Sequence, residues 1–204
     1  MFFDIRGDKM TTIEANIEGQ NVILKFAQLT DKRKSYEMLI SPETQKFMFD
    51  EKHPAPTWEE FNEEDDSYYS GKASKDGCYL FIEYKGDVIG SISYACEYEK
   101  IPYAELDIWM KSTAYTGKGL GTESINILID FIHKTYHVNH FLIRPWRKNI
   151  NAISAYKKCG FNEEINFKTE DYYSEENLRK YGEGDYGIAE TMNLVKRIED
   201  DNNA

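Results

Sequence analysis

The chain has 204 residues, of which 41% are hydrophobic and 30% charged, a balance typical of one soluble globular domain with a substantial core. Its formal net charge of −11 makes nucleic acid an unsuitable partner, because phosphate binding requires a basic surface. No apolar run is long enough to span a membrane, so we expect no membrane partner either.

The N-terminal stretch and the cysteines indicate the cellular compartment of the protein. Residues 1–12 carry acidic side chains and lack the apolar region of a signal peptide. The three cysteines, Cys78, Cys96 and Cys159, are an odd number without C-x-x-C spacing, which favours reduced thiols in a cytoplasmic protein. Neither they nor the four histidines have the spacing of metal ligands, so we expect no metal.

The first third of the chain predicts a strand followed by two helices. After an irregular extension over residues 1–19, the pattern indicates a strand over 21–26 and a helix over 30–40. Residues 41–56 are rich in proline and aromatic side chains and are predicted to form a loop. A T-W-E-E capping box then opens a second helix, over 57–69.

A β-hairpin is predicted next. Residues 78–84 and 88–98 have the composition of strands, and Lys85-Gly86-Asp87 between them is a hairpin signal. Gly90 lies inside the second strand, which indicates a bulge or a close approach of two backbones.

A further strand over 103–110 leads into a glycine-rich loop and a long helix. Alternation along the strand places Glu105, Asp107 and Trp109 on one face. Glycines then stand at positions 117, 119 and 121 around Lys118, and apolar residues at helical spacing continue to Tyr136. When a strand, a glycine loop and a helix follow in this order, the backbone N–H groups of the loop and the positive N-terminal end of the helix dipole face the same place. Such a place suits a phosphate.

Two common phosphate-binding motifs do not fit this loop. The P-loop pattern fails because Lys118 is followed by Gly119 and no glycine stands five residues before Gly117. The dinucleotide pattern G-x-G-x-x-G fails at its third glycine, and no acidic residue ends a strand about twenty residues later.

The rest of the chain predicts a strand over 138–144, a helix over 149–160 with Asn149 as its N-cap, and two more strands over 161–168 and 186–195. An acidic, tyrosine-rich connection through Gly184 separates the last two strands. The implied order is β-α-α-β-β-β-α-β-α-β-β.

Two segments in this order resemble the coenzyme motifs of the GCN5-related N-acetyltransferases (GNAT). T-G-K-G-L-G-T at 116–122 is similar to the R/Q-x-x-G-x-G/A loop that cradles the pyrophosphate of acetyl-CoA, with Thr116 at the Arg/Gln position. Residues 149–161 are similar to the family's N-x-x-A-I-x-x-Y-x-K-x-G-F segment. The resemblance implies the GNAT α/β fold, a mixed and mostly antiparallel sheet with helices on both faces, over residues 20–196, followed by a frayed tail at 197–204.

The resemblance also implies which residues bind acetyl-CoA, the expected cosubstrate. They lie at the end of the strand, in the glycine loop and on the Asn149 helix: Trp109, Met110, Thr116, Gly117, Lys118, Gly119, Leu120, Gly121, Thr122, Asn149, Ala152 and Tyr156. Tyr156 matches the tyrosine that donates a proton to the departing thiolate, and a phenol is a suitable donor for this step.

The substrate amine arrives protonated and needs a base. Asp107 matches the catalytic aspartate of the aminoglycoside 6′-N-acetyltransferases, the members that the motifs most resemble. Glu105 matches the acidic position of the protein N-terminal acetyltransferases. The alternatives are a small cationic amine, a protein N-terminus, or a non-catalytic module that binds acetyl-CoA; a monomer and a homodimer both stay open.

One departure concerns the segment before the Asn149 helix. The aminoglycoside enzymes have D-P there, and this chain has Arg144-Pro145-Trp146-Arg147. The two arginines are compatible with the 3′-phosphate of coenzyme A, with an acidic group of the substrate, or with solvent.

Overall fold

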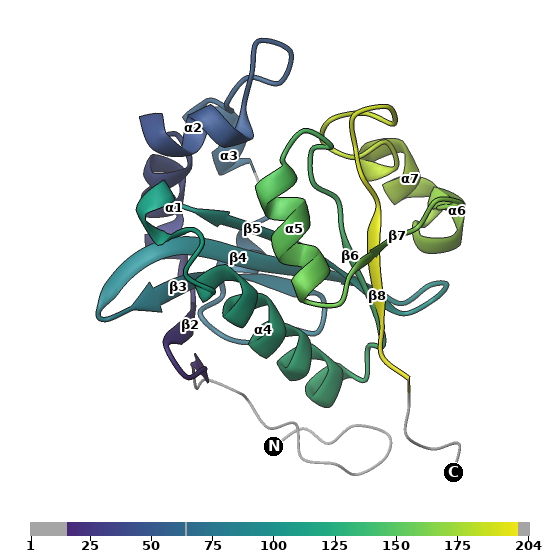
Figure 1. Cartoon of the computed structure of the whole chain (residues 1–204), viewed down its shortest axis with the longest axis horizontal. Helices are drawn as coiled ribbons and strands as arrows, with labels where there is room; N and C mark the ends of the chain where they lie inside the picture. The colour runs from purple at the N-terminus through teal and green to yellow at the C-terminus, as the bar shows by residue number, and fades with distance from the viewer. Residues whose placement is uncertain (1–15, 64, 200–204) are drawn as a thin grey trace.

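A computed structural model of the chain describes residues 16–63 and 65–199, which build an eight-stranded sheet in the order β1-β2-β3-β4-β5-β6-β8-β7 (Figure 1). The strands are β1 Ile17–Glu18, β2 Val22–Phe26, β3 Gly77–Tyr84, β4 Asp87–Glu97, β5 Tyr103–Met110, β6 His140–Ile143, β7 Asn162–Glu163 and β8 Leu194–Arg197. Neighbouring strands are antiparallel except β5 and β6, which run parallel. The mixed, mostly antiparallel sheet is confirmed.

Helices cover both faces of this sheet, as expected. The α-helices are α1 Lys32–Leu39, α2 Pro42–Met48, α3 Trp58–Asn62, α4 Leu120–Tyr136, α5 Ile150–Lys158, α6 Thr169–Tyr172 and α7 Glu175–Tyr181. Short 3-10 helices are η1 Leu29–Asp31, η2 Asp66–Tyr69 and η3 Thr113–Tyr115. In Figure 1, α4 and α5 lie side by side over the near face of the sheet.

Strand alternation separates the two faces. Leu80 and Ile82 of β3 belong to the main core, which also contains the apolar residues of α4 and α5. Phe81, between them, points to the other face and packs with Tyr36 of α1 and Phe61 of α3. On the same opposite face, the C-terminal half of the sheet packs against tyrosines of the α6 region. The far face therefore carries two separate apolar clusters, the second of which includes Tyr103 of β5.

The hairpin prediction is confirmed. Lys85 and Gly86 link β3 to β4 with φ values of 54° and 86°, so both central residues have the left-handed conformation of a type I′ turn. Gly90 shows both expected features. The β3–β4 register shifts beside it, and an added Cβ would lie 2.3 Å from the carbonyl oxygen of Trp109 on β5.

Two predictions in the first third of the chain are wrong. The expected loop over 41–56 contains α2, which begins with Ser41 as N-cap and Pro42 at the first helical position. The expected helix over 57–69 is divided into α3 and η2. Its capping box is present between Thr57 and Glu60, but Asp65 caps a separate turn by accepting a hydrogen bond from the Ser67 N–H.

The C-terminal strands are shorter than predicted. Of the expected strand over 161–168, only β7 forms, because the chain turns where the Phe167 N–H bonds the carbonyl of Glu164. The expected strand over 186–195 is replaced by turns, and β8 begins only at Leu194. The connection between them contains α6 and α7, which the sequence did not indicate.

The expected terminal extensions fall largely on residues 1–15 and 200–204, which lie outside the described residues. Ile17–Glu18, inside the expected N-terminal extension, forms β1 and pairs with β2.

Candidate active site

The sheet opens in its middle, where β5 and β6 pair over only three residues. The last pair joins Glu105 to Leu142, after which β6 ends at Ile143 while β5 continues to Met110. Residues 106–110 therefore stay bonded to β4 on one side and present an edge that β6 does not cover on the other. Such an edge offers backbone N–H and C=O groups to an extended ligand that contains amides.

The glycine loop follows β5 and ends at the first turn of α4. Gly117 and Gly119 have φ values of 70° and 80°, in the left-handed region that favours glycine, and Gly119 is the N-cap of α4. An added Cβ at either residue would meet no described atom within 4 Å. The loop thus leaves open space in front of the helix N-terminus, and this is where the sequence places the pyrophosphate.

The Asn149 helix is built as the sequence predicts. Asn149 caps α5 by accepting a hydrogen bond from the Ala152 N–H at 3.2 Å. At the other end Gly160 has a φ of 89°, and the Phe161 N–H bonds the carbonyl of Tyr156 at 3.2 Å. This is a Schellman C-cap, which stops the helix and fixes where Tyr156 lies.

The remaining expected cofactor residues lie around this opening. Trp109 is buried on the Asp107 face of β5, whereas Met110 packs against the main core. Leu120 is a core residue of α4, and Lys118 is exposed. The Thr116 hydroxyl donates to the carbonyl of Thr113 at 2.9 Å. The part that each of these residues plays in binding stays a prediction.

Asp107 of β5 and Tyr156 of α5 come from different elements, and the charge of Asp107 acts on the Tyr156 phenol. Tyr156 is 7% exposed, and burial followed by the negative charge of Asp107 raises the pKa of its phenol. No described residue hydrogen-bonds the Tyr156 hydroxyl. Asp107 is exposed on the far face of β5, between the two apolar clusters. That the two side chains act together at the opening of the sheet stays a prediction.

Glu105 lies on the same face as Asp107 in a different environment. Its Oε1 accepts from Arg144 Nε at 2.7 Å and its Oε2 from the Tyr173 hydroxyl at 2.7 Å. The Arg144 guanidinium also lies 4.9 Å from the centre of the Tyr173 ring. Burial alone would lower the pKa of Arg144, but Glu105 and Tyr173 raise it above its usual value. Arg144 is therefore engaged within the fold, which answers the question that the sequence left open.

Arg147 is also engaged within the fold. Its guanidinium bonds the Glu163 carboxylate at 3.0 Å and the carbonyl of Thr191 at 3.2 Å. Beside it, the Trp146 indole N–H donates to Glu190 at 2.7 Å, and this bond followed by Lys148 lowers the pKa of Glu190. These contacts hold the segment before β8 against the end of β6.

Sequence reasoning missed Tyr186, whose ring stacks on Trp146 with centroids 5.8 Å apart and an angle of 16°. Burial, then the charges of Asp107, Asp185 and Asp50, raise the pKa of Tyr186 to about 12. The available signal was a D-Y pair between Gly184 and Gly187, which is typical of a turn.

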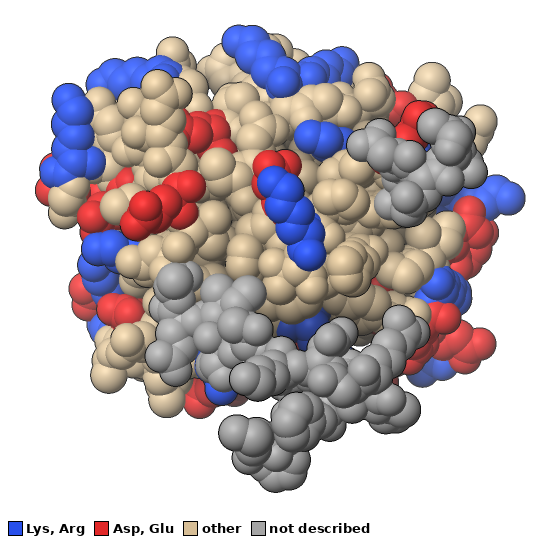
Figure 2. All heavy atoms as spheres, turned by 90° about the horizontal axis from the view of Figure 1, so that it is seen from below, with Lys and Arg blue, Asp and Glu red and all other residues tan. Residues whose placement is uncertain are grey.

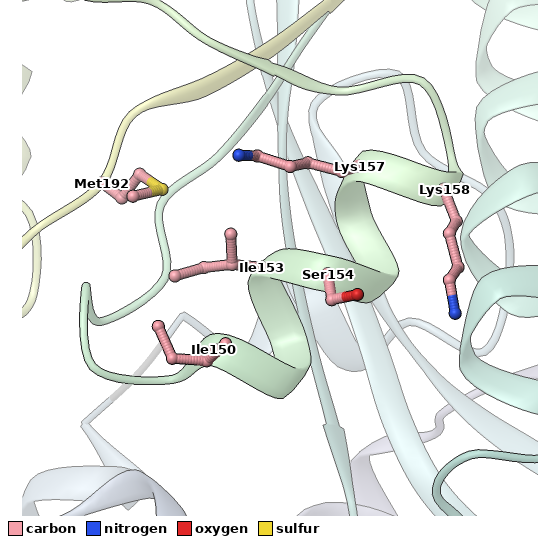
Figure 3. A pocket seen from close by; sticks show the side chains of 6 residues that line it. All are labelled: Ile150, Ile153, Ser154, Lys157, Lys158 and Met192. Carbon is pink, nitrogen blue, oxygen red and sulfur yellow. The ribbon is translucent and has the colours of Figure 1, made fainter.

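A surface hollow of about 540 Å³ lies along α5, apart from this opening. Ile150, Ile153, Ser154, Lys157, Lys158 and Met192 line it. Figure 3 shows Met192 facing Ile153 and Lys157, while Lys158 points the other way. Neither Asp107 nor Tyr156 lines the hollow, so its size says nothing about the reacting groups.

Among the described residues no group of three or more His, Cys, Asp or Glu could hold a metal ion. In the same part of the chain, no helix has the length and apolar character needed to cross a membrane. Figure 2 shows one face of the molecule, on which Lys and Arg side chains lie among Asp and Glu side chains.

Comparison with protein families identifies the class. Residues 21–162 match the model described as "Acetyltransferase (GNAT) domain". The chain therefore belongs to the GNAT acetyltransferases, enzymes that take the acetyl group from acetyl-CoA, and the expected membership of the GNAT family is confirmed.

Individual relatives are more distant. The chain is 31% identical over 96 residues to the spermine/spermidine N(1)-acetyltransferase of Bacillus subtilis strain 168. That alignment covers 44% of this chain and 63% of the relative, which is less than two thirds of the relative's length.

Solved structures show the same fold. The aminoglycoside acetyltransferase AAC(6′)-Ib in complex with coenzyme A aligns with a TM-score of 0.63 at 18% identity, covering 86% of this chain and 94% of that one. The ribosomal L7/L12 alpha-N-protein acetyltransferase RimL aligns with a TM-score of 0.62 at 15% identity, covering 90% and 94%. At such identities the likeness shows the fold alone.

Proposed function

We propose that the chain transfers the acetyl group of acetyl-CoA to a primary amine of a small cationic acceptor, with Asp107 as the base and Tyr156 as the acid. The observation that carries this proposal is the juxtaposition at the opening of the sheet: the charge of Asp107 acts on the buried phenol of Tyr156. In this proposal the base and the acid act from the two sides of the uncovered edge of β5.

The described residues fit acetyl-CoA. The open space at Gly117 and Gly119, in front of the α4 N-terminus, suits a pyrophosphate, and the free edge of β5 suits the amide-containing arm. When bound there, acetyl-CoA supplies an activated acetyl group as a thioester. The protein's part is then to hold that group beside the amine and to move two protons.

Asp107 acts on the acceptor. An ammonium is not a nucleophile, so the amine must lose a proton before it attacks. An exposed carboxylate attracts the ammonium by charge and receives this proton, either directly or through a water molecule. The face on which Asp107 lies is open to solvent, which is where a soluble acceptor enters.

Tyr156 acts on the leaving group, the thiolate of coenzyme A. Because burial and Asp107 both raise the pKa of its phenol, the side chain stays protonated at neutral pH. It therefore holds a proton that it can donate to the departing sulfur. The Schellman cap of α5 fixes its backbone and so the direction of this donor.

The acceptor is proposed as a small polycationic amine. Asp50 and Asp185 join Asp107 in acting on the phenol of Tyr186, so negative charge gathers beside the proposed base. Spermine, spermidine and aminoglycosides, which appear in the names of the relatives, all belong to this class. Glu105 is engaged by Arg144 and Tyr173, which weighs against the protein N-terminal alternative that would use Glu105 as base.

An amine panel tests the proposal. Release of the coenzyme A thiol is measured with spermidine, kanamycin and a peptide with a free N-terminus. We expect turnover with at least one of the two polycations and little with the peptide, and we expect Asp107→Asn to remove most of it near neutral pH.

Two results would overturn the proposal. Transfer to the peptide alone would support the N-terminal acetyltransferase instead. Calorimetric binding of acetyl-CoA without thiol release from any amine would indicate a non-catalytic binding module.

A further inference from the structure

We propose that Glu123, in the first turns of α4, is a positioning residue for acetyl-CoA, because it ties the helix that follows the glycine loop to the turn between β1 and β2. This inference rests on the proposed function, which places the pyrophosphate in front of the α4 N-terminus. It adds a residue that acts through the backbone of the loop, and it makes the β1–β2 turn, residues 19–22, part of what sets the affinity for acetyl-CoA.

The Glu123 carboxylate accepts hydrogen bonds from two residues of the β1–β2 turn. Its Oε1 accepts from the backbone N–H of Asn21 at 2.6 Å and from that of Val22 at 3.2 Å, and its Oε2 accepts from the Asn21 side-chain amide at 2.9 Å. Hydrogen bonds to an ionised carboxylate are about twice as strong as those between neutral groups. The contact therefore joins two segments that are 101 to 102 residues apart in the chain.

The position of Glu123 in its helix explains why it bonds outward. The N-cap of α4 is Gly119, so Glu123 stands one residue beyond the N3 position. From N3 a glutamate reaches back to the N-cap of its own helix, as Glu60 does in α3. One residue later the side chain leaves the helix on another side, and here it meets the β1–β2 turn.

The β1–β2 turn is shaped to receive this carboxylate. The Gly19 N–H bonds the carbonyl of Val22 at 2.8 Å, which closes the turn. A Cβ added at Gly19 would lie 2.6 Å from Glu123 Oε1 and 3.3 Å from Ile127, one helical turn further along α4. A side chain at position 19 would therefore push the carboxylate away, and glycine is what lets it reach the N–H groups of the turn.

The backbone of Glu123 completes the N-terminal turn that faces the loop. Its N–H donates to the carbonyl of Gly119 at 2.9 Å. The intervening residues Leu120, Gly121 and Thr122 have N–H groups without an acceptor in the helix, as the first N–H groups of every α-helix do. Such groups are the donors that a phosphate at a helix N-terminus uses. Holding Glu123 in place therefore holds the direction of these donors.

The glycine loop depends on how its two ends are held. At the end of β5, the Lys111 N–H bonds the carbonyl of Ile89 at 2.9 Å, which fixes the beginning of the loop on β4. Between that point and α4, Gly117 and Gly119 lie in the left-handed region. Because glycine loses more conformational freedom than other residues when it is fixed, a loosely held end would make binding of a ligand more costly. Glu123 holds the helical end.

Calorimetry of acetyl-CoA with the full chain tests the inference. Glu123→Ala removes the carboxylate, Glu123→Gln removes its charge, and Gly19→Ala displaces it without any change in α4. Each variant should weaken the affinity for acetyl-CoA by about 10-fold, the factor for one hydrogen bond to a charged group. With an amine that the unchanged chain acetylates, the KM for acetyl-CoA should rise while kcat stays constant, because the reacting groups are untouched.

The matched control is Glu60→Ala. The Glu60 carboxylate also lies near the start of a helix, α3, and accepts the backbone N–H of Thr57 at 2.7 Å, so its removal likewise lowers the free energy of unfolding. It should leave the affinity for acetyl-CoA unchanged. Unchanged affinity in both Glu123→Gln and Gly19→Ala would overturn the inference, and so would an equal loss in Glu60→Ala. If Glu123→Ala does not fold, these other variants decide.

Hydrogen exchange supplies a measurement that a purely structural contact would not alter. Coupling between two sites is reciprocal, so bound acetyl-CoA should slow the exchange of the Asn21 and Val22 amides, and this slowing should disappear in Glu123→Gln. The Glu60 amide, which bonds Thr57 Oγ1 at 3.2 Å, reports the general effect of the ligand on stability. If acetyl-CoA slows the amides of the β1–β2 turn no more than that of Glu60, the inference is overturned.

The two readouts separate this inference from the proposed function. If no amine is acetylated but the Glu123 variants weaken calorimetric binding of acetyl-CoA, the proposed function fails and the positioning role stands. If amines are acetylated and the Glu123 and Gly19 variants bind acetyl-CoA as the unchanged chain does, the positioning role fails and the proposed function stands.

Discussion

Arg144 and Glu105 form an ion pair at the residue where β5 and β6 stop pairing, with 2.7 Å between Nε and Oε1. The Arg144 side chain is 6% exposed and that of Glu105 26%. Tyr173 takes the second carboxylate oxygen, and Arg144 also reaches the carbonyl of Gly182, where the turn-bearing connection begins. The ion pair therefore lies at the point where the sheet opens. It engages Glu105, whereas Asp107 on the same face is exposed.

The ion pair should contribute strongly to stability. Arg144→Met leaves the Glu105 carboxylate without its cation and is expected to lower the free energy of unfolding by about 3 kcal/mol, as for a broken buried pair. Urea denaturation measures the loss. Lys134→Met is the control, because Lys134 pairs with Asp130 on the exposed side of α4 and its loss should cost less than about 1 kcal/mol. If both variants lost the same free energy of unfolding, burial of the Arg144–Glu105 ion pair would have no effect on stability.

Asp107→Asn tests the base. The change keeps shape but removes the charge and the proton acceptor, so the rate should fall sharply near neutral pH and partly recover at high pH, where the free amine needs no deprotonation. Affinity for coenzyme A should stay nearly unchanged. Glu105→Gln is the companion variant, and its rate–pH profile should keep the shape of the unchanged enzyme. If Glu105→Gln alone alters that profile, Glu105 is the base.

Tyr156→Phe tests the acid. The hydroxyl has no described hydrogen-bond partner, so the free energy of unfolding should change by less than about 1 kcal/mol. Turnover should fall by about 10²-fold if the phenol donates the proton. Tyr181→Phe, on the exposed end of α7, serves as control and should change neither quantity. Full turnover in Tyr156→Phe would leave Tyr156 with a packing role only.

Gly121 gives the cleanest test of the pyrophosphate loop. It is helical, and an added Cβ would lie 3.8 Å from Ile108, an ordinary contact, so Gly121→Ala should fold and bind acetyl-CoA. Gly121→Glu adds a negative charge at the same place and should abolish binding in calorimetry. Gly119→Glu should do the same, but its φ of 80° adds backbone strain that complicates the result. Unchanged affinity in both Glu variants would remove the pyrophosphate from this loop.

Glu123 should make the free energy of unfolding depend on pH in the acidic range. Burial alone would raise its pKa, but hydrogen bonds from Asn21 and Val22 outweigh burial and hold the pKa below its usual value of 4.5. A depressed pKa contributes stability above the unfolded value that is lost as pH falls through the folded one. The difference in urea midpoint between the unchanged chain and Glu123→Gln should therefore be large near neutral pH and shrink below about pH 4. A constant difference would contradict the linkage.

The sequence predicted the centre of the fold well because its signals there are local. Glycine at 86 fits its turn, Gly90 fits a close approach, and the Asn149 and Gly160 caps fix both ends of one helix. The errors arose where one signal masked another. Proline at 42 suggested a loop although Ser41-Pro42 is also a helix start, and a strand was expected over 186–195 where Gly187 makes a turn.

The candidate site likewise has a part that local sequence signals predicted and a part that they did not. Motif spacing alone placed the glycine loop and Tyr156, because each lies within one short segment. It left both Glu105 and Asp107 as candidates for the base, because their different environments depend on Arg144 and Tyr173, which are 39 and 68 residues away from Glu105. Tyr186 was missed because its importance comes from contacts with Trp146 and His53, two segments that only the folded chain brings together.

The placement of β8 between β6 and β7 has a consequence for biosynthesis. The antiparallel run from β1 to β5 is complete once residue 110 has emerged from the ribosome, and its contacts are between near neighbours in sequence. The other half of the sheet needs residues 194–197 as its middle strand. We therefore expect the nascent chain to form the glycine loop and α4 well before the second half of the sheet can close, because that closure must wait until residue 197 has emerged.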